Sequence, residues 1–149
     1  HKGAVWSDIE GSTKEEVIRE AMQRLGQEIQ LDPEMITELL LDREKMMPTA
    51  LNKGIAVPHT RDTQLVDHHD VVAICFLKEP LEYGALDGEP VHTLFFLFAA
   101  DNKRHLHLLA KIAHLANSDE ARTLFRAKPE KLELMHYIKE WESQLKSID

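Results

Sequence analysis

Residues 52–60 read Asn52-Lys53-Gly54-Ile55-Ala56-Val57-Pro58-His59-Thr60. The apolar centre, Ile55–Val57, predicts a brief buried strand. Gly54 permits unusual backbone angles before this strand, and Pro58 supplies no amide donor after it. We therefore expect the chain to leave the sheet at His59, with one ring nitrogen bound to a carbonyl and the other presented as a nucleophile or ligand. A solvated loop histidine is the alternative interpretation of this segment.

Two helices are expected before this segment. The first runs from Ser12 to about Ile29 and opens with capping-box spacing, followed by apolar residues at helical intervals. The second begins at the capping pair Asp32-Pro33 and ends near Met46. Arg43 falls in its last turn, where a salt-bridged cation at a helix end is the simple interpretation. Residues 1–11 show no period and are interpreted as a linker or arm, which leaves 12–149 as the folded domain.

Two long apolar runs follow, at residues 71–77 and 93–99. Each has the composition of a central strand that is covered on both faces, and Gly84 and Gly88 mark turns between them. A helix from Asp101 to about Ala116, an amphipathic segment at 118–127 and a last helix from 129 to about 146 complete the chain. This order predicts a single-domain α/β protein with a mixed β-sheet flanked by helices, similar to a three-layer sandwich.

The composition excludes several classes of protein. A chain of 149 residues with 43% hydrophobic residues suits one domain with a full core. The net charge of −8, without a basic run, argues against direct binding of nucleic acid. The lone cysteine, Cys75, lies in an apolar run, which predicts a reducing, cytoplasmic compartment. No apolar run is long enough for membrane insertion. Because the sequence begins at His1 rather than methionine, we expect an excised segment or a tag remnant.

The segment Gly54–His59 resembles the active-site signature of the mannitol/fructose-type enzyme IIA domains of the bacterial phosphoenolpyruvate-dependent phosphotransferase system. In that family an arginine lies sixteen residues before the active-site histidine, which is the position of Arg43. A second family histidine lies about forty-six residues after it, in a His-Leu-x-x-Leu segment, which is the position of His105. The segment Pro80–Val91 is similar to the hairpin region of the nitrogen-regulatory IIA branch.

The same resemblance implies a function and a set of site residues. His59 would accept a phosphoryl group from the histidine-containing phosphocarrier protein, and Arg43 and His105 would share the charge of that group. Thr49 and Thr60 would donate supporting hydrogen bonds, although both are also ordinary turn residues. Thr49 is the one expected residue kept in the segment before the strand, where the family has a glycine-rich run. No metal or other cofactor is implied.

Several outputs remain open. The resemblance of Pro80–Val91 favours a regulatory, nitrogen-regulatory-like role in which phosphorylation changes binding to a target protein. The alternative is a IIA component that donates phosphate to a IIB domain of a fructose/mannitol-type sugar transporter. A different class, a metal-dependent hydrolase, would use His59, His105 and an acidic residue as ligands, but the sequence places no third ligand.

Overall fold

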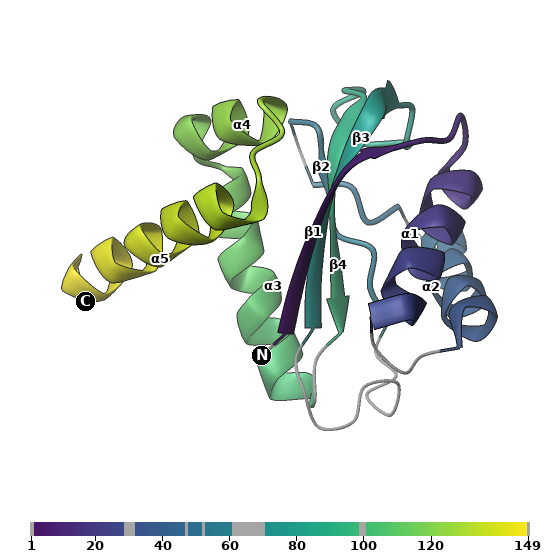
Figure 1. The fold of residues 1–149 in the computed structure, drawn as a ribbon, viewed down its shortest axis with the longest axis horizontal. Helices are drawn as coiled ribbons and strands as arrows, with labels where there is room; N and C mark the ends of the chain where they lie inside the picture. Colours follow the sequence, from purple (N-terminus) through teal and green to yellow (C-terminus); the bar gives the residue numbers. More distant parts are fainter. Residues whose placement is uncertain are drawn as a thin grey trace.

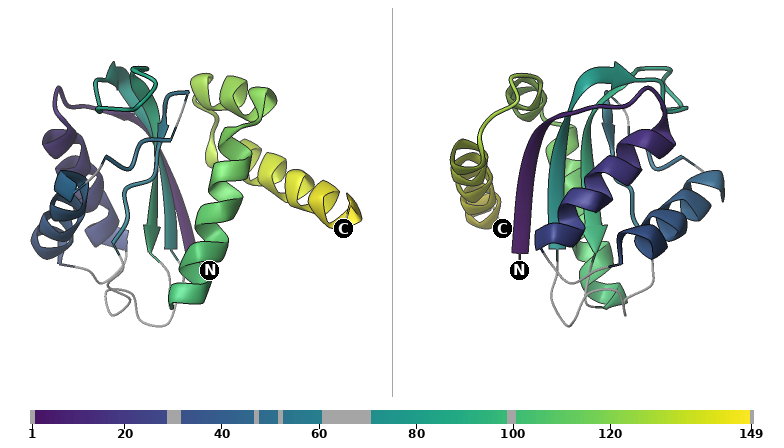
Figure 2. Two further views of the ribbon diagram at one scale, coloured as in Figure 1. Left: turned by 180° about the vertical axis from the view of Figure 1, so that it is seen from behind. Right: turned by 45° about the vertical axis from the view of Figure 1, so that its right-hand side comes forward.

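The helices and strands form three layers (Figure 1). A computed structural model describes residues 2–28, 32–46, 48–51, 53–60, 71–98 and 101–148. Within these ranges the elements are, in chain order, β1 (Lys2–Ile9), α1 (Lys14–Glu28), α2 (Pro33–Met46), β2 (Ile55–Ala56), β3 (Val71–Leu81), β4 (Val91–Phe98), α3 (Asn102–Ala116), α4 (Asp119–Arg126) and α5 (Lys131–Ile148). Helices α1 and α2 cover one face of the sheet, and α3–α5 lie on the other (Figure 2). The prediction of a mixed sheet flanked by helices is confirmed.

The sheet has the strand order β1-β3-β4-β2. The two central strands, β3 and β4, pair antiparallel, with Ile74 opposite Phe95. The short β2 pairs parallel with β4, and β1 pairs parallel with β3. Both edges of the sheet are therefore occupied by strands from the first part of the chain, while the centre comes from a hairpin in its middle.

The two central strands bury side chains on both faces, as their unbroken apolar sequences predict. Alternate residues of β3 point to opposite sides, because successive side chains of a strand do so. Ala73 and Cys75 pack with α1 and α2, whereas Ile74 and Phe76 pack with α3 and α4. The sheet thus separates two hydrophobic clusters, and the second of them also contains the residues that lead to His59.

Residues 2–9 form an edge strand, so the interpretation of residues 1–11 as a linker or arm is wrong for this part of the chain. The pairing with β3 shifts register between Trp6 and Ile9, and Asp8 has a φ of 57°. Such an irregularity breaks the period of two by which a strand is detected. Ala4 and Ile9 are nevertheless buried against α1 and α2, and Trp6 packs beside them.

The first helix is capped one residue later than its sequence indicates. Thr13 accepts a hydrogen bond from the amide of Glu16 at 3.1 Å, which makes Thr13 the N-cap residue. The Glu16 carboxylate accepts in turn from the Ser12 amide at 3.3 Å. The N-cap half of a capping box is therefore formed by Thr13 and Glu16 instead of Ser12 and Glu15, while the Glu16 carboxylate bonds the amide one residue before the cap.

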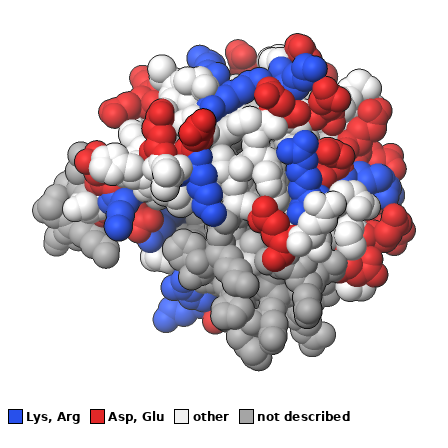
Figure 3. All heavy atoms as spheres, viewed as in Figure 1, with Lys and Arg blue, Asp and Glu red and all other residues white. Residues whose placement is uncertain are grey.

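Charge is unevenly distributed on the surface. Acidic side chains are frequent over α1 and α2, on the right in Figure 3. Some of them form ion pairs along the helix surface, such as Glu15 with Arg19 at 3.2 Å. None of the described helices is long and apolar enough to cross a membrane.

Gly54 and Gly88 both have a positive φ, but only at Gly54 would an added Cβ meet a neighbouring side chain. Gly54 has a φ of 89°, and a Cβ there would lie 2.5 Å from Cδ2 of His92, whose ring also bonds Thr93 at 2.7 Å. Gly88 has a φ of 71° and no heavy atom within 4 Å of such a Cβ. We expect Gly88→Ala to lower the free energy of unfolding by about 1–2 kcal/mol through backbone strain. Gly54→Ala should cost about 1–3 kcal/mol more, because His92 must move.

Urea unfolding of the two variants measures this difference. Adding His92→Ala to each variant should remove most of the extra cost at Gly54 and leave the cost at Gly88 unchanged. Equal losses for the two glycine variants would show that His92 does not restrict this position.

Candidate functional site

His59 lies where the segment after β2 leaves the sheet. The carbonyl of Pro58 accepts a hydrogen bond from the amide of Leu97 at 3.2 Å, and His59 itself pairs with Leu97 as an isolated bridge. Further back, the carbonyl of Gly54 accepts from the amides of His92 and Thr93 at 2.8 and 3.2 Å. Hydrogen bonds to β4 therefore hold the segment at both ends, and His59 is 9% exposed.

The imidazole of His59 has a defined orientation. Its Nδ1 lies 2.7 Å from the carbonyl oxygen of Val57. A carbonyl can only accept, so Nδ1 carries the proton and, in the neutral ring, the lone pair is on Nε2. The expected hydrogen bond between one ring nitrogen and a backbone carbonyl is present.

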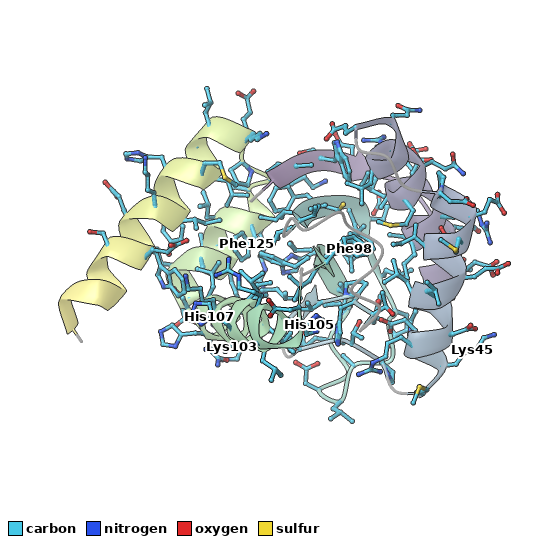
Figure 4. All side chains as sticks on the ribbon, turned by 90° about the horizontal axis from the view of Figure 1, so that it is seen from below. Lys45, Phe98, Lys103, His105, His107 and Phe125 are labelled. Atoms are coloured by element: carbon cyan, nitrogen blue, oxygen red, sulfur yellow. The ribbon has the colours of Figure 1, made fainter. Side chains whose placement is uncertain are left out.

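His105 approaches His59 from α3. The two ring centroids are 4.9 Å apart, with an angle of 54° between the ring planes, and His105 is 4% exposed. Figure 4 shows His105 on the side of α3 that faces the sheet, whereas Lys103 and His107 lie on the outer side. Two histidines separated by more than forty residues in the sequence thus share one buried place at the end of β4 and the start of α3.

The start of α3 is already capped by a carboxylate. The Asp101 side chain accepts from the amide of Arg104 at 2.8 Å, and the Asp101 carbonyl accepts from the amide of His105 at 2.9 Å. The helix dipole still favours an anion near this end. The amide of His105, however, is used within the helix, so His105 would meet an anion through its ring.

Thr49 is placed differently from the role that the resemblance implies. Its amide donates to Oε1 of Glu44 at 3.0 Å, and its hydroxyl donates to Oε2 of the same buried carboxylate. A hydroxyl has one proton, so Thr49 in this conformation cannot also donate to a phosphoryl oxygen. Its carbonyl instead accepts from the amide of Val57 at 3.0 Å, which connects Thr49 to the backbone that holds His59.

Arg43 and Thr60 complete the set of predicted residues. Arg43 lies in the last turn of α2, half-buried, directly before Glu44. Thr60 is half-buried and follows His59. The structure therefore brings His59 and His105 into contact, links Thr49 to His59 through Val57, and places Arg43 at the end of the helix to which Thr49 is bound.

Sequence reasoning missed Glu44. This carboxylate is buried at 5% exposure and has hydrogen bonds with Thr49 and Lys14. A signal was present, because position 44 continues the buried stripe of Ile36 and Leu40 at intervals of four residues. A charged residue on the buried stripe of a helix must have partners or a function.

Tyr83 lies beside Thr49 in the same buried cluster as Glu44. Burial, followed by the negative charge of Glu44, raises the pKa of the Tyr83 hydroxyl far above its ordinary value. Tyr83 is therefore a neutral donor at every physiological pH, and its oxygen lies 3.4 Å from that of Thr49.

The described residues hold no group of three or more side chains suited to binding a metal ion, so the third ligand of a hydrolase is not found among them.

Comparisons with known proteins agree on one family. The model of the family described as "Phosphoenolpyruvate-dependent sugar phosphotransferase system, EIIA 2" matches residues 1–141. The nitrogen regulatory protein of Pseudomonas aeruginosa is 32% identical over 125 residues, which cover 82% of this chain and 80% of that protein. The fructose-specific EIIABC component of the phosphotransferase system of Bacillus subtilis is 31% identical over 124 residues, which cover 81% of this chain but 19% of that larger protein.

A solved structure extends this similarity to the fold. The crystal structure of the nitrogen regulatory protein IIA-Ntr from Neisseria meningitidis matches with a TM-score of 0.73 at 30% identity. The match covers 81% of this chain and 83% of that one. At this identity the correspondence concerns sequence as well as fold.

Because Asp101 caps the start of α3, we expect its side chain to help hold the ring of His105 against that of His59. Removing an N-cap side chain costs about 1 kcal/mol, so Asp101→Ala should destabilise the protein by about that amount. Ser118→Ala is the matched control, because Ser118 caps α4 in the same way and accepts from the amide of Ala121 at 3.2 Å. We expect only Asp101→Ala to weaken the nuclear Overhauser contacts between the rings of His59 and His105. If these ring contacts are equally strong in Asp101→Ala and Ser118→Ala, the cap of α3 does not position His105.

Proposed function

Because this chain belongs to the EIIA 2 family of the phosphoenolpyruvate-dependent sugar phosphotransferase system, we propose that it is a phosphocarrier domain whose acceptor is Nε2 of His59. The proposed donor is the phosphohistidine of the histidine-containing phosphocarrier protein. One observation carries the assignment: Nδ1 of the buried His59 donates to the carbonyl of Val57 at 2.7 Å, which directs the lone pair to Nε2.

The transfer is an in-line displacement at phosphorus. The lone pair of Nε2 forms the new nitrogen–phosphorus bond while the bond to the donor imidazole breaks, and the donor ring leaves with that electron pair. The proton on Nδ1 of His59 stays in its hydrogen bond to Val57 throughout. No proton has to leave the acceptor, so transfer between two histidines needs no separate general base.

Three cationic or polar groups would stabilise the transferred phosphoryl oxygens. The ring of His105, with its centroid 4.9 Å from that of His59, would donate a hydrogen bond to an oxygen of the phosphoryl group carried by Nε2. Arg43, in the last turn of α2, would supply a permanent positive charge with a planar fork of donors. Thr60 would contribute a hydroxyl beside His59. Thr49 enters this proposal as a backbone anchor, since its hydroxyl is bound to Glu44.

Labelling with phosphate tests the acceptor. Incubation with labelled phosphoenolpyruvate, the first enzyme of the system and the carrier protein should add one acid-labile phosphoryl group, and His59→Ala should take up none. His105→Ala should keep the acceptor and slow transfer by about 100- to 1000-fold, the usual cost of losing one donor to a developing charge. Arg43→Lys should recover part of the rate lost in Arg43→Ala, because a point charge cannot copy the guanidinium fork. Label on His105 in the wild-type protein would exchange the two roles.

We infer a regulatory, nitrogen-regulatory-like output. The support is the segment Pro80–Val91, which resembles that branch, together with the similarity to nitrogen regulatory proteins of several bacteria. In this role the phosphorylation of His59 changes how the surface around it binds a target protein. The proposed compartment is the cytoplasm, consistent with the free, buried thiol of Cys75.

A second output is favoured by one comparison, the similarity to the fructose-specific EIIABC component. In that role His59 would pass its phosphoryl group to a IIB domain of a fructose- or mannitol-type transporter. The two roles place different demands on the same histidine, because a transporter component must discharge whenever sugar is present.

Discharge of the loaded protein distinguishes these outputs. Phospho-His59 protein is mixed with fructose- and mannitol-type IIB domains, with and without the corresponding sugars, and the remaining phosphate is followed over time. We expect the regulatory protein to retain its phosphate on the timescale in which an authentic transporter IIA discharges. Rapid, sugar-dependent loss to a IIB domain would overturn the regulatory role and leave the acceptor assignment intact.

A further inference from the structure

The carboxylate of Glu44 is almost completely removed from water, with 3% of its side chain exposed. It also lies in the last turn of α2, where the helix dipole disfavours a negative charge. Burying an ion without partners costs several kcal/mol, and the cost is offset only by good geometry. A residue held under these conditions calls for a specific explanation.

Three groups surround this carboxylate. Oε1 accepts from the amide of Thr49 at 3.0 Å and from Nζ of Lys14 at 3.4 Å, and Oε2 accepts from the hydroxyl of Thr49. Tyr83 closes the cluster at 1% exposure, with Nζ of Lys14 4.2 Å above the centre of its ring. Lys14 from α1 and Thr49 from the segment after α2 therefore meet at the carboxylate of Glu44, and Tyr83 from the loop after β3 packs beside both of them.

Thr49 passes this constraint towards the acceptor histidine. Residues 49–51 run antiparallel to residues 55–57, with Ala50 bridged to Ala56. Within this pairing the amide of Val57 donates to the carbonyl of Thr49 at 3.0 Å. The carbonyl of Val57 in turn accepts from Nδ1 of His59 at 2.7 Å. Three hydrogen bonds in series thus connect the carboxylate of Glu44 to the imidazole of His59.

We propose that Glu44 is a positioning residue for His59, which fixes the carbonyl of Val57 through Thr49 and thereby selects the Nδ1–H tautomer. In that tautomer the lone pair needed for attack on phosphorus is on Nε2. An imidazole without a fixed acceptor at Nδ1 populates both tautomers, and the Nε2–H form has no lone pair where the phosphoryl group arrives. The importance of this device for transfer rests on the proposed function, whereas the tautomer itself is a property of the resting protein.

Two variants weaken the hydrogen bonds between Glu44 and Thr49 while keeping the volume of the buried side chains. Glu44→Gln keeps the size of the side chain and one acceptor for the Thr49 amide, but it places an amide group against the Thr49 hydroxyl and removes the charge beside Lys14. Thr49→Val deletes the hydroxyl and keeps the β-branched shape and the backbone bonds. Glu15→Gln is the matched control, because it removes a carboxylate from an exposed pair with Arg19 that does not touch this network.

Nitrogen-15 NMR of the unphosphorylated protein, titrated through neutral pH, reports which ring nitrogen of His59 is protonated. Once the imidazole of His59 is neutral, wild type and Glu15→Gln should show a protonated Nδ1 and an unprotonated Nε2. Glu44→Gln and Thr49→Val should show a mixture of tautomers. Their phosphoryl uptake should be slower by about 10- to 100-fold, the scale on which misplacement of a reacting group acts.

Urea unfolding of each variant shows whether a change in tautomer or rate comes from a folded protein. If Glu44→Gln folds and matches Glu15→Gln in both tautomer and rate, Glu44 has a structural role alone and the proposal is overturned. If Glu44→Gln fails to fold, Thr49→Val decides by the same two criteria. Mixed tautomers together with label that persists in His59→Ala would refute the assigned acceptor while supporting the positioning of His59 by Glu44.

Discussion

The pairing of the short segment 54–58 with β4 is the constraint on which the site depends. Carbonyls at Gly54 and Pro58 accept hydrogen bonds from amides of β4, so the segment is fixed at both ends although β2 itself has two residues. Proline suits the second of these positions, because its carbonyl is used and its missing amide is not needed. A chain held in this way delivers His59 at one place and in one direction.

A second, independent support comes from the opposite side of the segment. Thr49 is bound to the end of α2 through Glu44, and it holds Val57 from the side that does not face β4. The histidine therefore lies between a sheet and a helix end that are both anchored in the core formed with α1 and α2. The histidine partner from α3 belongs to the other layer, so the site forms where the two halves of the molecule meet.

Much of this arrangement could be predicted from the sequence. Unbroken apolar runs indicated β3 and β4, helical spacing indicated α1–α5, and the glycine and proline around residues 55–57 indicated where His59 leaves the sheet. The edge strand β1 escaped prediction because its irregular pairing near Asp8 breaks the alternation of side chains. Glu44 escaped because a charged residue near a helix end ordinarily faces water. The contact between His59 and His105 has no periodic signal, since it depends on how two layers pack, and it was expected from family spacing alone.

The strand order has a consequence for how the protein folds. The central hairpin of β3 and β4 is local in sequence, whereas β1 pairs Lys2 with Val71, and β2 pairs Ile55 with Thr93. Contacts that close long loops form more slowly than local ones, because the entropy of closing the loop is lost before the contact is gained. We therefore expect the edge strands to join a preformed hairpin late in folding. His59, the proposed acceptor, follows one of these late strands, so a newly made chain would become competent for the proposed transfer only when its sheet is complete.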